Sequence, residues 1–228
     1  MRTVVSATAQ KAALAAARSI ARKLRDAIAA RGSATLALSG GGSAAALLTE
    51  LARQPVDWSR VQVFQVDERL APAGDPARNL VALEQALVAA KKLPADRLHA
   101  MPVNEADLGA AAQAYFALLG QHAGDSPVLD VVHLGLGGDG HTASLFPDDP
   151  LVDVPAKAVL CSEPHAGFRR MTLSLPLISA ARHIVWYVTG ESKRGVLAQL
   201  ITRGWKAPAG RVARRHAVIY VDKAALDA

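Results

Sequence analysis

Short apolar runs alternate along the chain with longer stretches in which apolar residues recur at helical spacing. Near-continuous apolar runs closed by glycine or charged residues are typical of buried parallel strands, and they occur at 34–38, 61–66, 129–134, 158–161, 169–175, 183–189 and 216–222. Helical periodicity is found at 6–30, 44–53, 76–91, 105–122 and 192–202, with a short helix at 176–181. This alternation predicts an α/β fold in one domain, 1–228, with a mainly parallel open sheet and helices on both faces.

The stretch 129–147 combines a buried strand with a glycine-rich turn. Four of six consecutive residues in this turn are glycines, namely Gly135, Gly137, Gly138 and Gly140. We expect the chain to turn there and to start a helix at Thr142. Because ligands of open α/β sheets bind beyond the carboxyl ends of strands, Asp139 and His141 are candidates for orienting a substrate and moving a proton. The structural alternative is an ordinary loop histidine, with Asp139 capping the next helix.

A second glycine turn, Ser39-Gly40-Gly41-Gly42-Ser43, lies between the strand 34–38 and the helix 44–53. A strand, a glycine turn and a helix together offer free backbone N–H groups and a positive helix end to an anion. The spacing fits neither the dinucleotide fingerprint nor a P-loop, and no lysine follows. By itself the turn is only a weak indication of phosphate binding.

Charged residues also occur in two places where a strand ends or a helix begins. Asp67, Glu68 and Arg69 follow the strand 61–66, where charges belong either to a site or to a solvated strand end. Lys193 lies in the first turn of the helix 192–202, where the helix dipole disfavours a cation unless an anion is bound nearby. The alternative for Lys193 is a solvated side chain.

Composition narrows the class of protein. The chain has 228 residues, 51% of them hydrophobic, one cysteine (Cys161), and no apolar run of 18 residues. The N-terminal alanines are interrupted by charges, unlike a signal peptide, so we expect a cytoplasmic protein without a membrane segment. The net charge is +6, but the basic residues are scattered and aromatics make up 4%. We therefore expect no nucleic-acid partner and favour small anionic metabolites such as sugar phosphates.

The string from Asp130 to Pro147 resembles the signature of the 6-phosphogluconolactonases, with its Gly-x-Gly-x-Asp-Gly-His-Thr-Ala-Ser-Leu-Phe-Pro core. Leu38-Ser39-Gly40-Gly41 is similar to the loop that holds the sugar's phosphate in that family, and Asp67-Glu68-Arg69 to its second motif. The resemblance extends over about 33–224. Departures are Gly42 and Ala44 in the phosphate loop, Arg78 in place of serine before Asn79, and Gly210 in place of serine before the last strand.

The resemblance implies hydrolysis of 6-phospho-D-glucono-1,5-lactone to 6-phosphogluconate in the oxidative pentose phosphate pathway, on the fold of glucosamine-6-phosphate deaminase and ribose-5-phosphate isomerase. For that reaction we expect His141 to act as general base, Asp139 to orient either His141 or a sugar hydroxyl, and Arg69 to offer its charge either to the developing oxyanion or to the polar face of the substrate. The substrate and its phosphate would be held by Ser39, Gly40, Gly41, Ser43, Asp67, Arg170 and Lys193, with Arg169 as an alternative to Arg170. We expect no metal, no cofactor, and a monomer or small homo-oligomer.

Two other functions remain open. A deaminase or isomerase of the same fold would use the same phosphate loop, but similar deaminases have Asp-Glu-Tyr instead of Asp67-Glu68-Arg69 and a glutamate soon after the central histidine. A non-catalytic sugar-phosphate sensor would need a DNA-binding segment, and the 33 residues before the first predicted strand are too few for one. Arg69 and the missing glutamate favour the lactonase.

Overall fold

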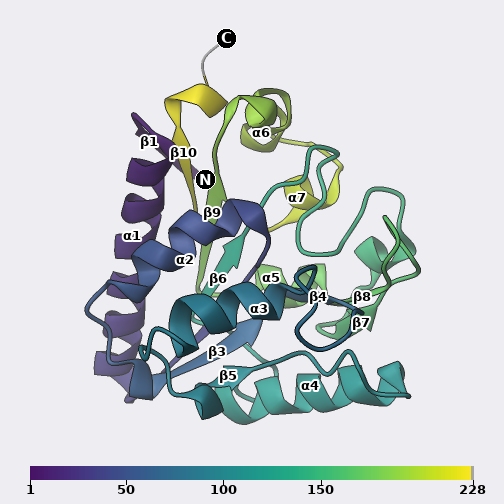
Figure 1. Ribbon diagram of the computed structural model, residues 1–228. Helices are drawn as coiled ribbons and strands as arrows, with labels where there is room; N and C mark the ends of the chain where they lie inside the picture. The colour runs from purple at the N-terminus through teal and green to yellow at the C-terminus, as the bar shows by residue number, and fades with distance from the viewer. Residues whose placement is uncertain (227–228) are drawn as a thin grey trace.

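The central sheet is parallel throughout. The computed structural model describes residues 1–226, apart from the side chain of Ser43, and its main sheet has the order β1-β10-β9-β6-β2-β3-β5 with every neighbouring pair parallel (Figure 1). The strands are β1 (Arg2–Ser6), β2 (Ala34–Leu38), β3 (Val61–Gln65), β5 (Leu98–His99), β6 (Val131–Leu134), β9 (His183–Val188) and β10 (Ala217–Asp222). The predicted fold class is confirmed.

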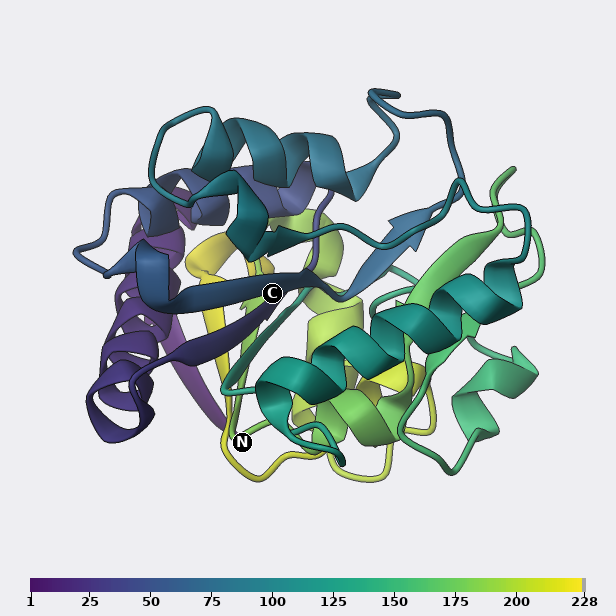
Figure 2. The ribbon, with the colours of Figure 1, turned by 90° about the horizontal axis from the view of Figure 1, so that it is seen from below.

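Helices cover both faces of this sheet and enclose a hydrophobic core on each side. One core contains buried residues of α1 (Ala9–Arg31), α2 (Ala45–Ala52) and α3 (Asn79–Leu83), which continues as the π-helical segment η3 (Glu84–Val88). The other contains residues of α4 (Leu108–Ala123), α5 (Leu175–Ser179), α6 (Arg194–Ile201) and α7 (Pro208–Arg211). The view from below shows α1 and α4 on opposite sides of the strands (Figure 2).

Local sequence explains the bounds of α1. Thr8 caps its start by accepting a hydrogen bond from the backbone N–H of Lys11, and Gly32 ends it in the left-handed conformation with φ 81°. Between them, Ala12, Ala13, Ala16 and Ala17 are fully buried, and their small side chains let the helix approach the sheet closely. Charged residues occupy the outer face, as the amphipathic pattern predicts.

The structure also has a separate antiparallel sheet of three strands. It has the order β4-β8-β7, formed by β4 (Asp67–Arg69), β8 (Arg170–Leu173) and β7 (Val159–Cys161). The register pairs Arg69 with Arg170 and Asp67 with Thr172. The sequence did not predict this pairing, which brings two predicted site segments 100 residues apart into direct contact.

Three further features differ from the sequence prediction. The strands β1 and β5 were not predicted, because their short apolar runs give little periodicity. The helix predicted at 76–91 begins only at Asn79. The helix predicted to start at Thr142 is wrong: Ala143 has φ 52°, a left-handed conformation that an α-helix cannot include, and the next helical turn is η5 (Pro150–Asp153).

The topology places two glycine turns side by side. From β2 the chain proceeds to β3 on one side, whereas β6 is flanked on its other side by β9. Such a reversal of strand order opens a crevice at the carboxyl ends of the two strands. The turn after β2 carries Ser39–Gly42 and the turn after β6 carries Gly135–His141.

Within residues 1–226, no helix has the length and apolar character needed to cross a membrane.

Candidate active site

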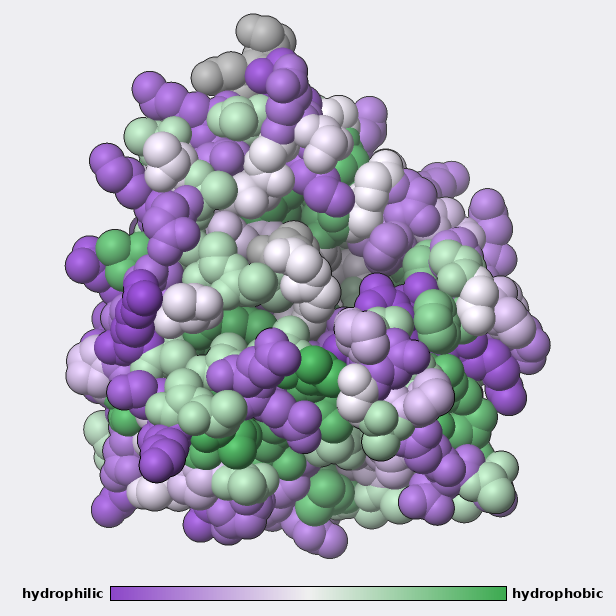
Figure 3. All heavy atoms as spheres, viewed as in Figure 1, coloured by the Kyte–Doolittle hydropathy of each residue, from purple (hydrophilic) through white to green (hydrophobic). Residues whose placement is uncertain are grey.

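A cleft of about 300 Å³ opens at this reversal of strand order. Figure 3 shows the corresponding surface hollowed between the part of the molecule that carries α1 and α2 and the part that carries β4, β7 and β8. Eight predicted site residues line the cleft: Ser39, Gly40, Gly41, Asp67, Arg69, His141, Arg170 and Lys193. Asp139 does not line it but contacts His141, and the side chain of Ser43 lies outside the described part of the structure.

Asp139 and His141 form a hydrogen-bonded pair at one wall of the cleft. The His141 Nδ1 atom lies 2.6 Å from Asp139 Oδ1, which also accepts the backbone N–H of His141 at 3.0 Å. Partial burial acts to raise the pKa of Asp139, but these bonds from His141 outweigh it and hold the pKa below its ordinary value. The carboxylate is therefore ionised at neutral pH and fixes Nδ1 as the donor, so Nε2 carries the free lone pair.

Glycine is required at Gly137 for this arrangement. A Cβ atom at position 137 would lie 2.1 Å from His141 Nδ1. The turn is closed by a bond from the Gly137 N–H to the His141 carbonyl (2.8 Å) and one from the Gly140 N–H to the Gly137 carbonyl (3.1 Å). The hydroxyl of Thr142 donates to the Gly135 carbonyl at 2.9 Å. These bonds fix the position of the imidazole from both ends of the loop.

Ser144 has a different role from the helix start that the sequence predicted. Its side chain is fully buried and donates a hydrogen bond to Asp67 Oδ2 at 2.7 Å. Burial raises the pKa of Asp67, and the bond from Ser144 opposes that rise. Ser144 does not line the cleft, so it is a support for Asp67 and has no access to a substrate as a nucleophile.

Glu68 organises the opposite wall, and sequence reasoning assigned it no role of its own. Its buried carboxylate accepts the N–H groups of Arg69 (2.8 Å), Asn79 (2.7 Å) and Leu80 (2.8 Å), and the Gln65 amide at 2.8 Å. An anion at this position also suits the N-terminus of α3, which explains why the helix begins there. The partner Arg78, a departure from the family pattern, lies 3.4 Å from the same carboxylate.

Asn79 is a second residue that sequence reasoning left without a role. It lines the cleft, and its side-chain amide donates to the Asp67 carbonyl at 3.0 Å. A Cβ atom at Gly40 would lie 2.5 Å from Asn79 Cβ, so the Ser39–Gly42 turn and the start of α3 touch at this point. The signal that could have found Asn79 is its place in the continuation of the Asp67-Glu68-Arg69 motif.

Three cations face the cleft, from three different elements. Arg69 donates to the Ala77 carbonyl at 2.5 Å, and Lys193, in η6 (Glu191–Lys193), donates to the Leu136 carbonyl at 2.7 Å. Arg170 is 8% exposed, and its Nε atom is buried with no hydrogen-bond partner in the described part of the chain. Burial and then the charge of Arg69 lower the pKa of Arg170. A bound anion would supply the missing partner and relieve this repulsion.

Arg170, and not its neighbour Arg169, is the residue of the pair that lines the cleft. Arg169 is exposed and donates to the Ser162 carbonyl at 3.3 Å. Because successive side chains along a strand point to opposite faces, Arg170 points away from the side that Arg169 occupies. Its guanidinium carbon lies 5.3 Å from the centre of the Phe146 ring. The centre of the His141 ring lies 4.8 Å from the centre of the same ring, so Phe146 contacts both the cation and the imidazole.

The Ser39–Gly42 turn presents backbone groups to the cleft. The N–H groups of Gly40 and Gly41 donate to no acceptor among the described residues, while the N–H and the hydroxyl of Ser39 both bond to the His133 carbonyl. Gly41 has φ 87°, a conformation that favours glycine. These free N–H groups line the same cleft as Arg170 and Lys193. Backbone donors together with cations form a site suited to a phosphate.

The departure at Gly210 has a structural explanation outside the cleft. A Cβ atom there would lie 2.3 Å from the Trp205 carbonyl oxygen, and one at Gly140 would lie 2.6 Å from the Trp205 ring. Trp205 therefore packs between these two glycines, behind the loop that carries His141.

Among residues 1–226, no group of three or more His, Cys, Asp or Glu side chains has the arrangement of a metal site.

Comparisons with known proteins agree with this geometry. A family model described as "Glucosamine-6-phosphate isomerases/6-phosphogluconolactonase" matches residues 7–221. The 6-phosphogluconolactonase of Synechocystis sp. is 37% identical over 185 residues, which cover 79% of this chain and 77% of that protein. The structure of 6-phosphogluconolactonase from Trypanosoma cruzi has a TM-score of 0.85 at 25% identity, over 98% of this chain and 95% of that one.

The fold itself is shared more widely. A monomeric glucosamine-6-phosphate deaminase has a TM-score of 0.84 at 18% identity, over 99% of this chain and 98% of that one. The likeness to the deaminase fold, expected from the sequence, is confirmed. By the extent of the family match and the identity to its members, this chain belongs to the glucosamine-6-phosphate isomerase/6-phosphogluconolactonase family.

Proposed function

We propose that the protein is a 6-phosphogluconolactonase, which hydrolyses 6-phospho-D-glucono-1,5-lactone to 6-phosphogluconate, and that His141 is its general base. The observation that carries the proposal is the His141–Asp139 pair, 2.6 Å apart, on the same cleft as the unpaired Arg170 Nε and Lys193. An imidazole and an anion site in one cavity suit a substrate that carries both a phosphate and an activated ester.

Binding comes first in this scheme. The 6-phosphate lies against the N–H groups of Gly40 and Gly41 and takes charge-assisted hydrogen bonds from Arg170 and Lys193. Asp67, whose second oxygen is free of the Ser144 bond, accepts a hydroxyl of the sugar ring. Anchoring the phosphate places the lactone carbonyl near His141 and makes the attack effectively unimolecular.

The chemical step needs a single base. Nε2 of His141 removes a proton from a water molecule, and the resulting hydroxide adds to C1 of the lactone. Arg69 stabilises the negative charge that develops on the carbonyl oxygen. When the tetrahedral intermediate collapses, the bond from C1 to the ring oxygen breaks and His141 returns its proton to that oxygen. Asp139 stabilises the imidazolium between the two transfers.

Two features distinguish this reaction from deamination on the same fold. Arg69 occupies the position where similar deaminases carry tyrosine, and the segment 142–147 contains no carboxylate to open or close a sugar ring. Ser144 is bonded to Asp67 and buried, which leaves water as the nucleophile.

The test is a comparison of substrates. The purified protein should release acid from freshly generated 6-phosphogluconolactone well above the spontaneous rate, and unphosphorylated gluconolactone should react with a kcat/KM at least about 100-fold lower. Ammonia release from glucosamine 6-phosphate should be undetectable. Deamination without lactone hydrolysis would overturn the proposal, and binding of both compounds without turnover of either would favour a sensor.

A further inference from the structure

The connection from β7 to β8 is a tight hairpin that leads directly into Arg170. At its tip, the His165 N–H donates to the Phe168 carbonyl at 2.9 Å, and the Phe168 N–H donates to the His165 carbonyl at 3.2 Å. Between them, Ala166 and Gly167 have φ of 49° and 84°, the two positive values that a two-residue hairpin turn of this kind requires. The hairpin belongs to the side of the molecule opposite α1 (Figure 1). These bonds give it a defined shape, although its tip is exposed.

The hairpin holds Arg170 by its backbone and by its side chain. The N–H of Arg170 donates to the Ser162 hydroxyl at 3.1 Å, and its carbonyl accepts the Ser162 N–H at 2.8 Å. At the guanidinium, the Nη2 atom donates to the His165 carbonyl at 3.5 Å. Because Arg170 lines the active-site cleft, these contacts help to set the direction in which this cation points.

The ring of His165 makes a further contact, with a residue that also contacts Arg170. It stacks on the buried Phe146 ring, with the ring centres 3.6 Å apart and the ring planes inclined by 17°. The guanidinium carbon of Arg170 lies 5.3 Å from the centre of the same Phe146 ring. A cation at this distance is attracted by an aromatic face, so a contact that fixes the Phe146 ring also fixes the place of the cation. His165 does not line the cleft itself, and therefore acts through its neighbours.

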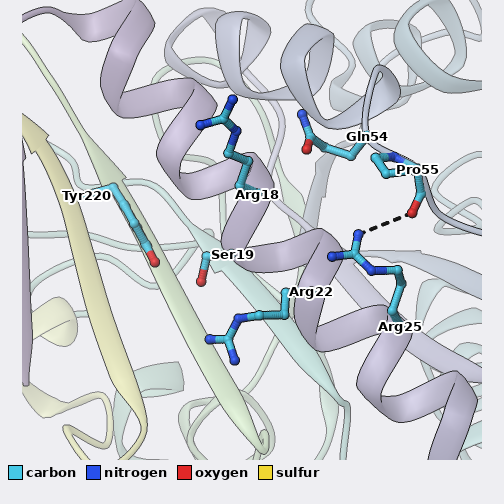
Figure 4. Close-up of a pocket in the computed structure, with 7 residues that line it drawn as sticks. All are labelled: Arg18, Ser19, Arg22, Arg25, Gln54, Pro55 and Tyr220. Carbon is cyan, nitrogen blue, oxygen red and sulfur yellow. Dashed lines mark hydrogen bonds between the residues drawn. The ribbon is translucent and has the colours of Figure 1, made fainter.

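The exposed arginines of α1 show what Arg170 would be without this support. Figure 4 shows Arg18, Arg22 and Arg25 extending from the helix, and Arg25 makes one hydrogen bond, to the Pro55 carbonyl at 3.2 Å. A long side chain of this kind loses much rotamer freedom when it binds an anion. Arg170 is already ordered by the hairpin and by Phe146, so a phosphate that binds it has less ordering to impose.

We propose that His165 is a positioning residue for Arg170: its ring, stacked on Phe146, keeps the guanidinium in the orientation that meets the phosphate of the substrate. The identity of that substrate rests on the proposed function, whereas the effect on anion binding does not depend on turnover. Since preorganisation lowers the cost of binding, loss of the ring should weaken the binding of phosphorylated compounds and leave the chemical step nearly unchanged.

The test replaces the ring and keeps the backbone of the hairpin. His165→Ala removes the stack, whereas His165→Phe keeps a flat aromatic ring against Phe146. We expect His165→Ala to raise KM for 6-phosphogluconolactone about fivefold, the size of effect that corresponds to one lost aromatic pair. Its kcat should stay within about twofold of the wild type, and His165→Phe should recover most of the affinity. Neither variant should change KM for unphosphorylated gluconolactone.

His122→Ala is the matched control. His122 is also an exposed histidine stacked on another ring, that of His99, with the ring centres 5.1 Å apart, and it does not line the cleft. The control should have wild-type KM and kcat. An equal rise of KM in His122→Ala, a fall of kcat without a rise of KM in His165→Ala, or a His165→Phe variant no better than His165→Ala would each overturn the role of His165.

A second readout separates this role from the proposed function. A phosphorus NMR titration with inorganic phosphate needs no turnover, and His165→Ala should weaken this binding about fivefold as well. Weaker phosphate binding in the variant of a protein that hydrolyses no lactone would refute the proposed function and support the role of His165. Lactone hydrolysis by the wild type, together with unchanged phosphate affinity in His165→Ala, would overturn the role of His165 alone.

Discussion

The two glycine turns at the reversal of strand order have similar compositions but differ in how many of their backbone N–H groups are bonded within the turn. In the turn after β6, the N–H groups of Gly137, Gly140 and His141 are bonded within the loop, and that of Gly138 has no acceptor in the described structure. In the turn after β2, the N–H groups of Gly40 and Gly41 have no acceptor in the described structure. The hydrogen bonds of the first turn fix one imidazole, whereas the N–H groups of Gly40 and Gly41 in the second turn are available to the ligand that we propose.

This difference shows how glycine can serve either chemistry or binding. In the loop of His141, glycine makes room for the ring, since a Cβ at Gly137 would overlap it. In the loop of Ser39, glycine leaves backbone donors accessible, and the charges come from elsewhere: Arg170 from β8 and Lys193 from η6. Variants of the first loop should therefore change turnover, and variants of the phosphate anchors should change affinity.

The largest effect is expected for Gly137→Ala. The added methyl group would lie 2.1 Å from His141 Nδ1, so the imidazole must leave its place beside Asp139. We expect kcat for lactone hydrolysis to fall about 100-fold or more, with a smaller change in KM. The control is Gly138→Ala, one residue further along the same loop, where a Cβ would meet nothing within 4 Å. Equal losses in both variants would contradict the role given to Gly137.

Removing a phosphate anchor should act mainly on affinity. Lys193→Met keeps the length of the side chain and loses its charge, and hydrogen bonds to charged groups contribute about 1.5–3 kcal/mol. We therefore expect KM for the phosphorylated lactone to rise about 10- to 100-fold, and kcat to change less. Hydrolysis of unphosphorylated gluconolactone is the control and should be unaffected. A loss of the same size with both substrates would mean that Lys193 does not bind the phosphate.

A smaller effect is expected for Asp139→Asn. The amide still accepts a hydrogen bond from Nδ1 but no longer stabilises the imidazolium. We expect kcat to fall about tenfold. The measurement is kcat of the variant and of the wild type at saturating 6-phosphogluconolactone. A kcat equal to that of the wild type would show that the charge of Asp139 does not assist the base.

The smallest effect is expected on stability, for Asp67→Asn. Burial raises the pKa of Asp67, so the folded protein holds this proton more tightly than the unfolded chain does. The native state therefore loses stability as the pH rises from the unfolded pKa through the folded one. Asparagine removes this loss and keeps an acceptor for Ser144. Thermal melts at pH 7 should show an unchanged or higher Tm, and a large decrease would contradict this.

Much of the fold could be predicted from the sequence because its strands are buried on both faces. Runs such as 61–66 and 183–189 have strong apolar character, and their order with the helices implies a parallel sheet. The strands β1 and β5 were missed because short edge strands depend on pairing with a neighbour that the sequence does not reveal. The antiparallel sheet was missed for the same reason, since β4 is three residues long and all three are charged.

The site was predicted as a set of residues but not as a network. Asp139, His141, Arg69 and Lys193 stand out in the sequence because charges follow strands or turns there. Glu68 and Ser144 act through contacts with residues that are distant in the chain, such as Asn79 and Asp67. The helix predicted at Thr142 failed because the backbone of Ala143 is left-handed, which no pattern of side chains indicated.

The central claim is that His141, held by Asp139, is the general base of lactone hydrolysis. The most direct measurement compares kcat for wild-type protein and His141→Ala on freshly generated 6-phosphogluconolactone, with and without added imidazole. We predict a loss of at least about 100-fold in the variant and partial recovery with imidazole, which replaces the missing base. A variant as active as the wild type would contradict the account.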